Sequence, residues 1–317
     1  MNYITKNNTI IFAPDYNDML NINLSLKFNK LIFSNYELDD KLFEAFENND
    51  FQNLKFIGNK FNQKVDNLPM SLTHLTFGSE FNQEVNRLPH NLTYLTFNVQ
   101  FNKKVNELPQ KITHLTFGWN FNQEVNRLPQ NITHLTFGRN FNQEVNMLPQ
   151  TITHLTFGYF FNQEVNMLPR NITHLTFGYE FNQKVNGLPQ KITHLTFDND
   201  FNQDCDILPS VKYLKLNSNN QYIINNMPNG IKELDLGYDF NLELNNLPSS
   251  IKKIVFNKNS EYDKELNCLP NFVEFLQLPE KYNKEILRFP LGLKTIKCSE
   301  NYEFLSDFVG YNVEYYD

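Results

Sequence analysis

Residues 112–118 read Ile-Thr-His-Leu-Thr-Phe-Gly, and nearly the same seven residues recur every 20 positions through the middle of the chain. Within this stretch, the apolar side chains of Leu115 and Phe117 alternate with the polar side chains of His114 and Thr116. Such alternation is typical of a β-strand that has one buried and one exposed face. The stretch therefore predicts a short strand that turns Leu115 and Phe117 toward a core and His114 and Thr116 toward solvent.

The strand belongs to a longer repeat of 20 residues. Successive rows read FNKKVNELPQKITHLTFGWN (101–120) and FNQEVNRLPQNITHLTFGRN (121–140), and the pattern runs from Phe61 through the row that starts at Phe201. A fixed period of this length is the signature of a stacked array in which each coil contacts its neighbours. Stacking is necessary because one coil buries too little apolar surface to offset the entropy lost in ordering it. We therefore expect a solenoid whose successive strands form a parallel sheet.

The remaining part of each row predicts how the chain returns from one strand to the next. Phe121 and Val125 supply apolar anchors, and Pro129 favours an extended path because it fixes φ and offers no N–H to a ladder. Asn122 and its counterparts in other rows are expected to bond the turn backbone as a ladder of amides. Twenty residues leave no room for a long helix, and only two residues of the chain are Ala. The predicted fold class is thus a repeat solenoid with a parallel β-sheet on one face, extended and turn segments on the other, 20-residue coils and little helix.

Departures from the repeat predict four regions along the chain. They are an N-terminal capping region with irregular first coils (1–60), regular repeats (61–210), degenerate repeats (211–301) and a C-terminal cap (302–317). Capping is expected because the terminal coils of a stacked array would otherwise expose their apolar faces. In the first region, KLIFS (30–34) and NLKFIG (53–58) are predicted strands, and DDKLFEAFE (39–47) is a predicted amphipathic helix with acidic residues at its start.

The net charge of -7 and the pI near 5.6 disfavour nucleic acid as the partner, because phosphate binding needs clustered Lys and Arg. Three widely spaced cysteines (Cys205, Cys268 and Cys298) form no C-x-x-C pair and are expected to be reduced thiols. The first residues lack the basic and apolar blocks of a signal peptide, and no apolar run approaches the roughly 20 residues that cross a bilayer. We therefore expect an intracellular, cytoplasmic protein that binds neither nucleic acid nor membrane.

The consensus F-N-x-x-V/L-x-x-L-P-x-x-I/L-T-x-L-x-F resembles the FNIP repeat, a relative of the leucine-rich repeat found in social amoebae and giant DNA viruses. The match is close over residues 61–210 and looser over 211–300. The resemblance implies a leucine-rich-repeat-like solenoid with no established enzymatic activity, acting in the host cell if the protein is viral. In viral members an F-box-like segment often precedes the repeats, which would imply a substrate receptor of a ubiquitin ligase. Residues 1–50 contain no L-P-x-E-I/L start of an F-box.

A column of histidines is predicted on the outward face of the sheet. One repeat position holds six of the seven histidines, namely His74, His114, His134, His154, His174 and His194, with Tyr94 in the remaining row. Neighbouring strands lie about 4.8 Å apart, so the imidazole rings should stack. The column has two interpretations: a module that responds to metal or protons, or neutral rings multiplied by duplication. We favour the second, and expect neither a metal nor another cofactor, because a straight column does not converge on an ion.

The position directly after the strand does not repeat. Its residues are Ser79, Val99, Trp119, Arg139, Tyr159, Tyr179 and Asn199. Trp, Tyr and Arg are enriched at binding hot spots, whereas neutral variation at an exposed position is the alternative explanation. We hypothesise that a partner-binding surface combines this stripe with the neighbouring histidine column, and its residues are Trp119, Arg139, Tyr159, Tyr179, His114, His134, His154 and His174.

Motifs for catalysis are not found in the sequence. There is no nucleophile elbow, phosphate-binding loop, His-Glu-x-x-His or paired-cysteine motif. One repeat position holds a column of carboxylates, Glu84, Glu124, Glu144 and Glu164, interrupted by Lys64, Lys104 and Lys184. This column is typical of a solvated edge rather than an acid/base pair. We therefore predict no enzyme but an intracellular scaffold that binds a protein partner, for which a host protein is one candidate, through the sheet face and adjacent rim. The alternatives are the ubiquitin-ligase substrate receptor and the module that responds to metal or pH.

Overall fold

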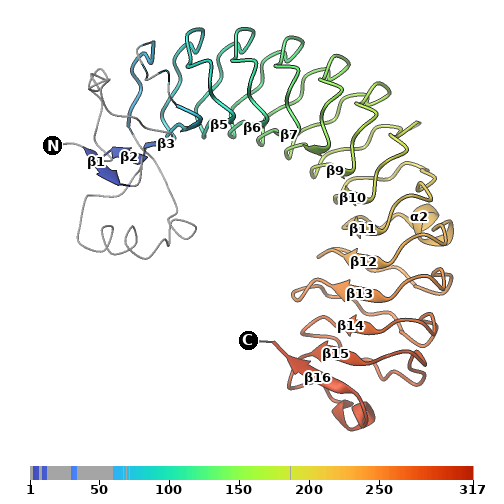
Figure 1. The fold of residues 1–317 in the computed structure, drawn as a ribbon. Helices are drawn as coiled ribbons and strands as arrows, with labels where there is room; N and C mark the ends of the chain where they lie inside the picture. The colour runs from blue at the N-terminus through green and yellow to red at the C-terminus, as the bar shows by residue number, and fades with distance from the viewer. Residues whose placement is uncertain are drawn as a thin grey trace. The chain divides into compact units, whose positions relative to one another are not determined.

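A computed structural model describes residues 3–6, 9–12, 30–33, 60–66, 68, 70, 72–185 and 187–316. The chain forms two compact units, Met1–Phe161 and Asn162–Asp317. In the coils from β4 onward, each coil of a unit adds one short strand to the sheet and closes through loops on the other side (Figure 1). The strand order in the sheet of each unit follows the chain order. The predicted repeat solenoid with a parallel sheet and little helix is therefore confirmed.

The first unit contributes the strands from β1 to β8. They are β1 (Tyr3–Lys6), β2 (Thr9–Phe12), β3 (Lys30–Phe33), β4 (His74–Thr76), β5 (Tyr94–Thr96), β6 (His114–Thr116), β7 (His134–Thr136) and β8 (His154–Thr156). β1 is antiparallel to β2, and each later strand is parallel to the one before it. The strand predicted at 30–34 is confirmed as β3, whereas the strand predicted at 53–58 and the helix predicted at 39–47 lie outside the described residues.

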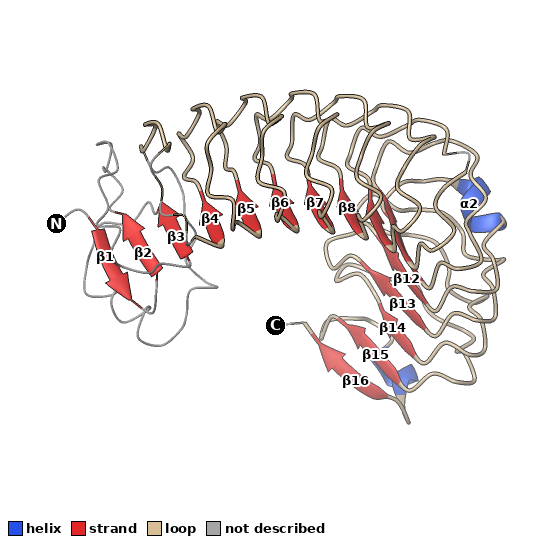
Figure 2. Cartoon of the chain, turned by 45° about the horizontal axis from the view of Figure 1, so that its top comes forward, coloured by secondary structure: helices blue, strands red, loops and turns tan. Residues whose placement is uncertain are grey.

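The second unit contributes the strands from β9 to β16. They are β9 (His174–Thr176), β10 (His194–Phe197), β11 (Tyr213–Leu216), β12 (Glu233–Leu236), β13 (Lys253–Phe256), β14 (Phe275–Gln277), β15 (Thr295–Cys298) and β16 (Asn312–Tyr315), all parallel to their neighbours. Helix in the described residues is confined to α2 (Gln221–Asn225) and the 3-10 helix η2 (Leu305–Phe308), as the few blue segments of Figure 2 show. No helix in this part of the chain has the length and apolar character needed to cross a bilayer.

The core of the first unit consists of the apolar side chains that the repeat places inward. Leu115 and Phe117 are at most 2% exposed and Phe121 is fully buried, whereas His114 on the opposite face of the strand is only partly buried. The rings of Phe117 and Phe121 stack 3.8 Å apart within a coil, and those of Phe117 and Phe137 lie 5.7 Å apart between coils. The predicted orientation of the strand is therefore confirmed, and stacked rings connect each coil to the next.

A ladder of amides bonds the turns on the loop side of the coils. The backbone N–H of Asn122 donates to Oδ1 of Asn102 at 3.0 Å. Oδ1 of Asn122 in turn accepts the backbone N–H of Asn142 at 3.0 Å and Nε2 of Gln143 at 2.9 Å. Because buried or half-buried backbone N–H groups need partners, the repeated asparagine satisfies a turn that has no regular secondary structure. The amide ladder expected at Asn122 is confirmed.

Candidate functional site

The turn that follows each of the strands β4 to β8 positions one residue of the predicted stripe. Trp119 follows β6, Arg139 follows β7 and Tyr159 follows β8. The N–H of Asn140 donates to the carbonyl of Trp119 at 2.8 Å, and the N–H of Phe160 donates to the carbonyl of Arg139 at 2.9 Å. These hydrogen bonds hold successive turns side by side. The Cα atoms of successive stripe residues are therefore neighbours, and their side chains can contact one another.

Arg139 contacts aromatic rings from the coils on both of its sides. Its guanidinium carbon, Cζ, lies 5.7 Å from the centre of the Trp119 ring, 4.7 Å from that of Tyr159 and 5.4 Å from that of Phe160. The rings of Tyr159 and Phe160 meet edge to face at 4.8 Å. Trp119 is 57% exposed, and Arg139 is exposed as well. The four residues Trp119, Arg139, Tyr159 and Phe160 are referred to below as the rim cluster.

The chemistry of the rim cluster follows from these contacts. A guanidinium over aromatic rings gains about 0.5–1 kcal/mol at an exposed site, which restrains the arginine without neutralising its charge. In the part of the chain that the structure describes, the guanidinium of Arg139 has no carboxylate partner and no hydrogen-bond acceptor. The cluster therefore presents an unpaired cation beside an exposed indole, a combination suited to binding rather than to catalysis.

Of the predicted stripe, Trp119, Arg139 and Tyr159 lie together in the first unit, with Phe160 as a residue that was not predicted. Tyr179 lies in the second unit, where it is half-buried and its carbonyl accepts the N–H of Asp200 at 3.1 Å. Phe160 escaped the sequence analysis because its repeat position holds amides in the preceding rows, at Asn120 and Asn140. The signal that could have found it is this replacement of an amide by an apolar ring directly after Tyr159.

The histidines stack as predicted within each unit. In the first unit, the ring centroids of His114 and His134 are 4.2 Å apart, and those of His134 and His154 are 4.1 Å apart. In the second unit, the rings of His174 and His194 are 4.0 Å apart. These distances are shorter than the strand spacing of about 4.8 Å, so the rings are in direct contact. The outward face of β6, β7 and β8 therefore carries a continuous column of imidazole rings beside the rim cluster.

Each ring of the column is also held through its Nδ1 atom. The Thr113 hydroxyl lies 2.9 Å from Nδ1 of His114, and the same contact recurs in neighbouring coils. Burial lowers the pKa of His114, and charges on His134, His154 and His74 lower this pKa further. Among the described residues, no three His, Cys, Asp or Glu side chains converge on a point that could hold a metal ion. His114, at the centre of this column, is therefore neutral at neutral pH.

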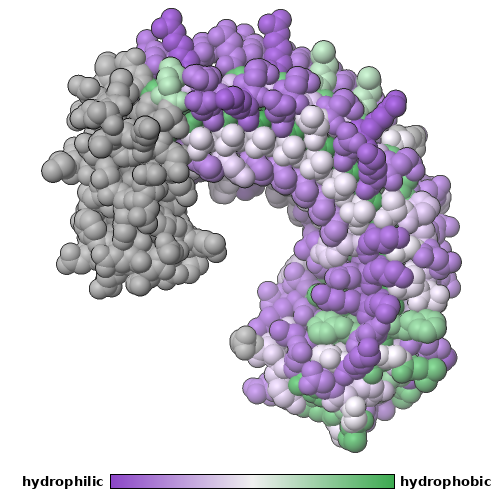
Figure 3. Space-filling view, in the orientation of Figure 1, coloured by the Kyte–Doolittle hydropathy of each residue, from purple (hydrophilic) through white to green (hydrophobic). Residues whose placement is uncertain are grey.

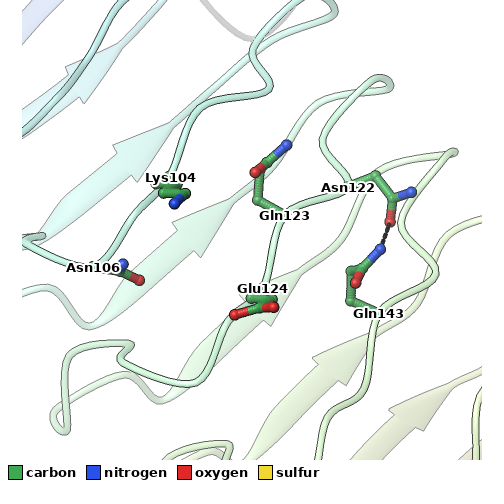
Figure 4. A pocket seen from close by; sticks show the side chains of 6 residues that line it. All are labelled: Lys104, Asn106, Asn122, Gln123, Glu124 and Gln143. Carbon is green, nitrogen blue, oxygen red and sulfur yellow. Dashed lines mark hydrogen bonds between the residues drawn. The ribbon is translucent and has the colours of Figure 1, made fainter.

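The loop side of the first unit has a polar hollow of about 250 Å³. Its lining consists of Lys104, Asn106, Asn122, Gln123, Glu124 and Gln143 (Figure 4). The hydrogen bond drawn in Figure 4, from Gln143 to Asn122, belongs to the amide ladder of the turns. Lys104 and Glu124 occupy the same repeat position on successive coils, where the sequence predicts a solvated column of carboxylates interrupted by lysines. We therefore assign this hollow to the structure of the turns.

The surface in view in Figure 3 is mainly hydrophilic, with apolar colour confined to patches. Among the described residues of the first unit, the large apolar side chains that are exposed are Met70, Tyr94, Trp119 and Met147. Of these, Trp119 combines exposure with contact to a cation. The rim cluster is thus distinguished from the other exposed apolar positions of this unit by its chemistry as well as its exposure.

Comparison with known proteins connects this geometry to a family. The family model described as FNIP Repeat matches residues 61–98, 101–127, 124–160, 161–186, 184–219 and 219–259. The chain belongs to the FNIP-repeat family. The family resemblance expected from the consensus is therefore confirmed, and FNIP repeats span the coils that carry both the rim cluster and the histidine column.

Two solved structures share the fold of this FNIP-repeat chain. CroV588, a giant-virus protein described as a novel circular leucine-rich-repeat structure, is 40% identical with a TM-score of 0.65, and the match covers 87% of this chain and 42% of CroV588. The functional domain of InlJ from Listeria monocytogenes, which includes a cysteine ladder, is 12% identical with a TM-score of 0.52 over 82% of this chain and 62% of that domain. This chain therefore spans less than half of CroV588. No curated protein sequence matches it.

Proposed function

We propose that this FNIP-repeat chain is a scaffold that binds a protein partner through the outward face of the sheet and the adjacent rim cluster. The observation that carries the proposal is the exposed indole of Trp119 held beside the exposed guanidinium of Arg139 on a neighbouring coil. A few hot-spot residues contribute most of the binding free energy at protein interfaces, and these residues are enriched in Trp, Tyr and Arg. Side chains that are already restrained lose less conformational entropy on binding, so the rim cluster can bind a partner at a lower entropic cost.

Fold and family support the same function. Leucine-rich-repeat-like solenoids are typical of protein-interaction scaffolds, because stacked coils create an extended surface. We further propose that the chain acts in the cytoplasm. We also propose that it has no catalytic role, since side chains that line the polar hollow of the first unit form hydrogen bonds of the amide ladder. The identity of 40% with a giant-virus protein supports a host protein as the partner.

The proposal is tested by affinity capture from an amoebal lysate with three forms of the full chain. They are the wild type, the Trp119→Ala variant and the Tyr238→Ala variant, which removes an exposed aromatic side chain from the second unit. Circular dichroism and thermal unfolding establish that all three are folded. We expect bound proteins, quantified by mass spectrometry, to be retained by the wild type and Tyr238→Ala and reduced about tenfold or more by Trp119→Ala.

Two other results would contradict the proposal in different ways. Equal recovery of the same proteins by all three forms would show that the rim cluster is not the binding surface. If no form enriches any protein over an empty matrix, the scaffold function itself is wrong. The ubiquitin-ligase hypothesis depends on residues 1–50, most of which lie outside the described residues, and nothing in β1, β2 or β3 adds support to it.

A further inference from the structure

We infer that the rim cluster binds an acidic peptide segment of its partner. An Asp or Glu carboxylate of that segment would lie on the guanidinium of Arg139, and a neighbouring apolar or aromatic side chain would lie on the indole of Trp119. The inference rests on the proposed function, because it names the chemistry of the partner at the same surface. It is argued from the geometry of Arg139, the charges around it and the exposure of Trp119.

The geometry of Arg139 leaves its hydrogen-bond donors available. Aromatic rings bind the flat face of a guanidinium, whose N–H groups point outward in its own plane. With Tyr159 at 4.7 Å and Trp119 at 5.7 Å, the rings restrain Arg139 from both sides. A restrained guanidinium with unpaired donors matches the two oxygens of a carboxylate, which it can bind through two parallel hydrogen bonds.

The surroundings of Arg139 supply no counter-ion among the described residues. At the repeat position that follows the stripe, the side-chain amide of Asn140 donates to Asn120 at 3.1 Å and that of Asn120 donates to Gln100 at 2.8 Å, so the coils of Trp119 and Arg139 carry neutral amides there. Lysines of the second unit differ, since Lys294 reaches a carboxylate oxygen of Glu274 at 2.6 Å. The positive charge of the rim cluster is thus left for an anion from outside the chain.

A single side-chain carboxylate fits this site better than a polyanion does. Nucleic acids and other polyphosphates need several clustered cations, whereas the rim cluster has one and the chain carries a net charge of -7. The indole of Trp119, which is 57% exposed, offers an apolar platform that phosphate groups do not use. An acidic peptide with an adjacent apolar residue satisfies both parts of the cluster.

A random peptide library displayed on phage and selected on the full immobilised chain tests the inference. We expect the enriched peptides to contain Asp or Glu next to an aromatic or aliphatic residue. Synthetic copies of these peptides should bind the Arg139→Gln variant about tenfold or more weakly, because the charge-assisted pair is lost. The Arg127→Gln variant is the matched control, since it removes an exposed arginine from the same unit outside the rim cluster, and it should bind as the wild type does.

Reversing the charge of Arg139 provides a second test, in which the sequence of the selected peptides changes rather than their binding being lost. Selection on the Arg139→Glu variant should enrich peptides with Lys or Arg where the wild type enriches Asp or Glu. Thermal unfolding of each variant verifies that the coils remain folded. Conversely, absence of any enriched peptide, or enriched peptides that bind Arg139→Gln as tightly as wild type, would overturn the inference.

The outcomes separate this inference from the proposed function. Peptides that lose binding with Trp119→Ala but contain no acidic residue would overturn the acidic partner and leave the rim cluster as the binding surface. If the enriched peptides bind the Trp119→Ala and Arg139 variants as tightly as the wild type, the rim cluster is not the binding surface, and the proposed function is wrong for this surface too. If a fluorescently labelled single-stranded DNA binds the wild type, loses affinity with Arg139→Gln and is not displaced by acidic peptides, the cation serves nucleic acid instead and the inference is wrong.

Discussion

Gly138 lies so close to the carbonyl oxygen of Gly118 that a Cβ atom on Gly138 would stand 1.9 Å from it. The two glycines occupy the same position on neighbouring coils, directly before Arg139 and Trp119. Real Cβ atoms essentially never come within 3.0 Å of another heavy atom, so a side chain at Gly138 would force the two turns to shift. The same two turns are joined by the hydrogen bond from the N–H of Asn140 to the carbonyl of Trp119 at 2.8 Å.

The Gly138→Ala variant should therefore be destabilised, because the turns must move apart to admit the methyl group. Overpacking of this kind costs about 1–3 kcal/mol in the free energy of unfolding. Rows with Asn98 and Asp198 at this position indicate that a coil can adapt to a side chain, so we expect lower stability rather than loss of the fold. Urea unfolding followed by circular dichroism measures the change, with Arg127→Ala as an exposed control expected to stay within about 0.5 kcal/mol of wild type. An unchanged midpoint for Gly138→Ala would contradict the close contact.

The phenylalanine columns should dominate the stability of the first unit. Phe121 is fully buried and stacks on Phe117 at 3.8 Å and on Phe141 at 6.1 Å. Phe121→Ala should lower the free energy of unfolding by about 3–5 kcal/mol and Phe121→Leu by less, as the cavity is smaller. Met147→Ala, which truncates a side chain that is 64% exposed, is the control. If urea unfolding gives equal losses of unfolding free energy for Phe121→Ala and Met147→Ala, the stacked rings do not stabilise the core.

Much of the fold could be predicted because each coil repeats the same pattern of buried and exposed residues. Alternation identified Leu115 and Phe117 as inward residues, and their burial agrees. The period of 20 residues predicted the register, in which Leu115 pairs with Leu95 and Leu135. Outside the repeats the same reasoning was weaker, because an irregular segment such as 39–47 has no second copy against which its pattern can be compared.

Most residues of the candidate site could be predicted from the sequence, whereas the contacts among their side chains could not. Trp119, Arg139 and Tyr159 stand out because they interrupt a repeated pattern. Whether Arg139 lies over rings or extends into solvent depends on its side-chain rotamer, which the repeat pattern does not specify. The ring spacing of 4.2 Å between His114 and His134 was likewise not predicted, because side-chain rotamers rather than strand spacing determine it.

Thiol reactivity should distinguish the three cysteines. Cys268 is exposed, whereas Cys205 and Cys298 are buried. Burial raises the pKa of Cys205 to about 12 and the pKa of Cys298 to about 11, so neither forms the reactive thiolate readily. A chromogenic disulfide reagent near neutral pH should therefore modify Cys268 rapidly and the other two only after denaturant is added. The Cys268→Ser variant should lose the rapid phase, and rapid modification of Cys205 in the folded protein would contradict its burial.

Acid should destabilise the first unit through the histidine column. Burial, followed by charges on His134, His154 and His74, lowers the pKa of His114 in the folded chain. Because this pKa lies below the unfolded value of about 6.5, the unfolded chain binds the proton more tightly than the folded chain does. The stabilising contribution of neutral His114 is therefore complete above about pH 6.5 and is lost as the pH falls below that value. The thermal unfolding midpoint should decrease between about pH 7 and about pH 5.

The His114→Tyr variant isolates this effect because the chain already places a tyrosine at the same position in the preceding coil. Tyr94 stacks on His114 with ring centroids 4.2 Å apart, so the variant keeps an aromatic ring in the column while removing one proton-binding group. Its unfolding midpoint should fall less on acidification than that of the wild type. His90→Gln removes an exposed histidine outside the column and should leave the acid sensitivity unchanged. Equal falls for wild type and His114→Tyr would place the acid response elsewhere, and an NMR titration of His114 with a midpoint at or above about 6.5 would contradict the lowered pKa.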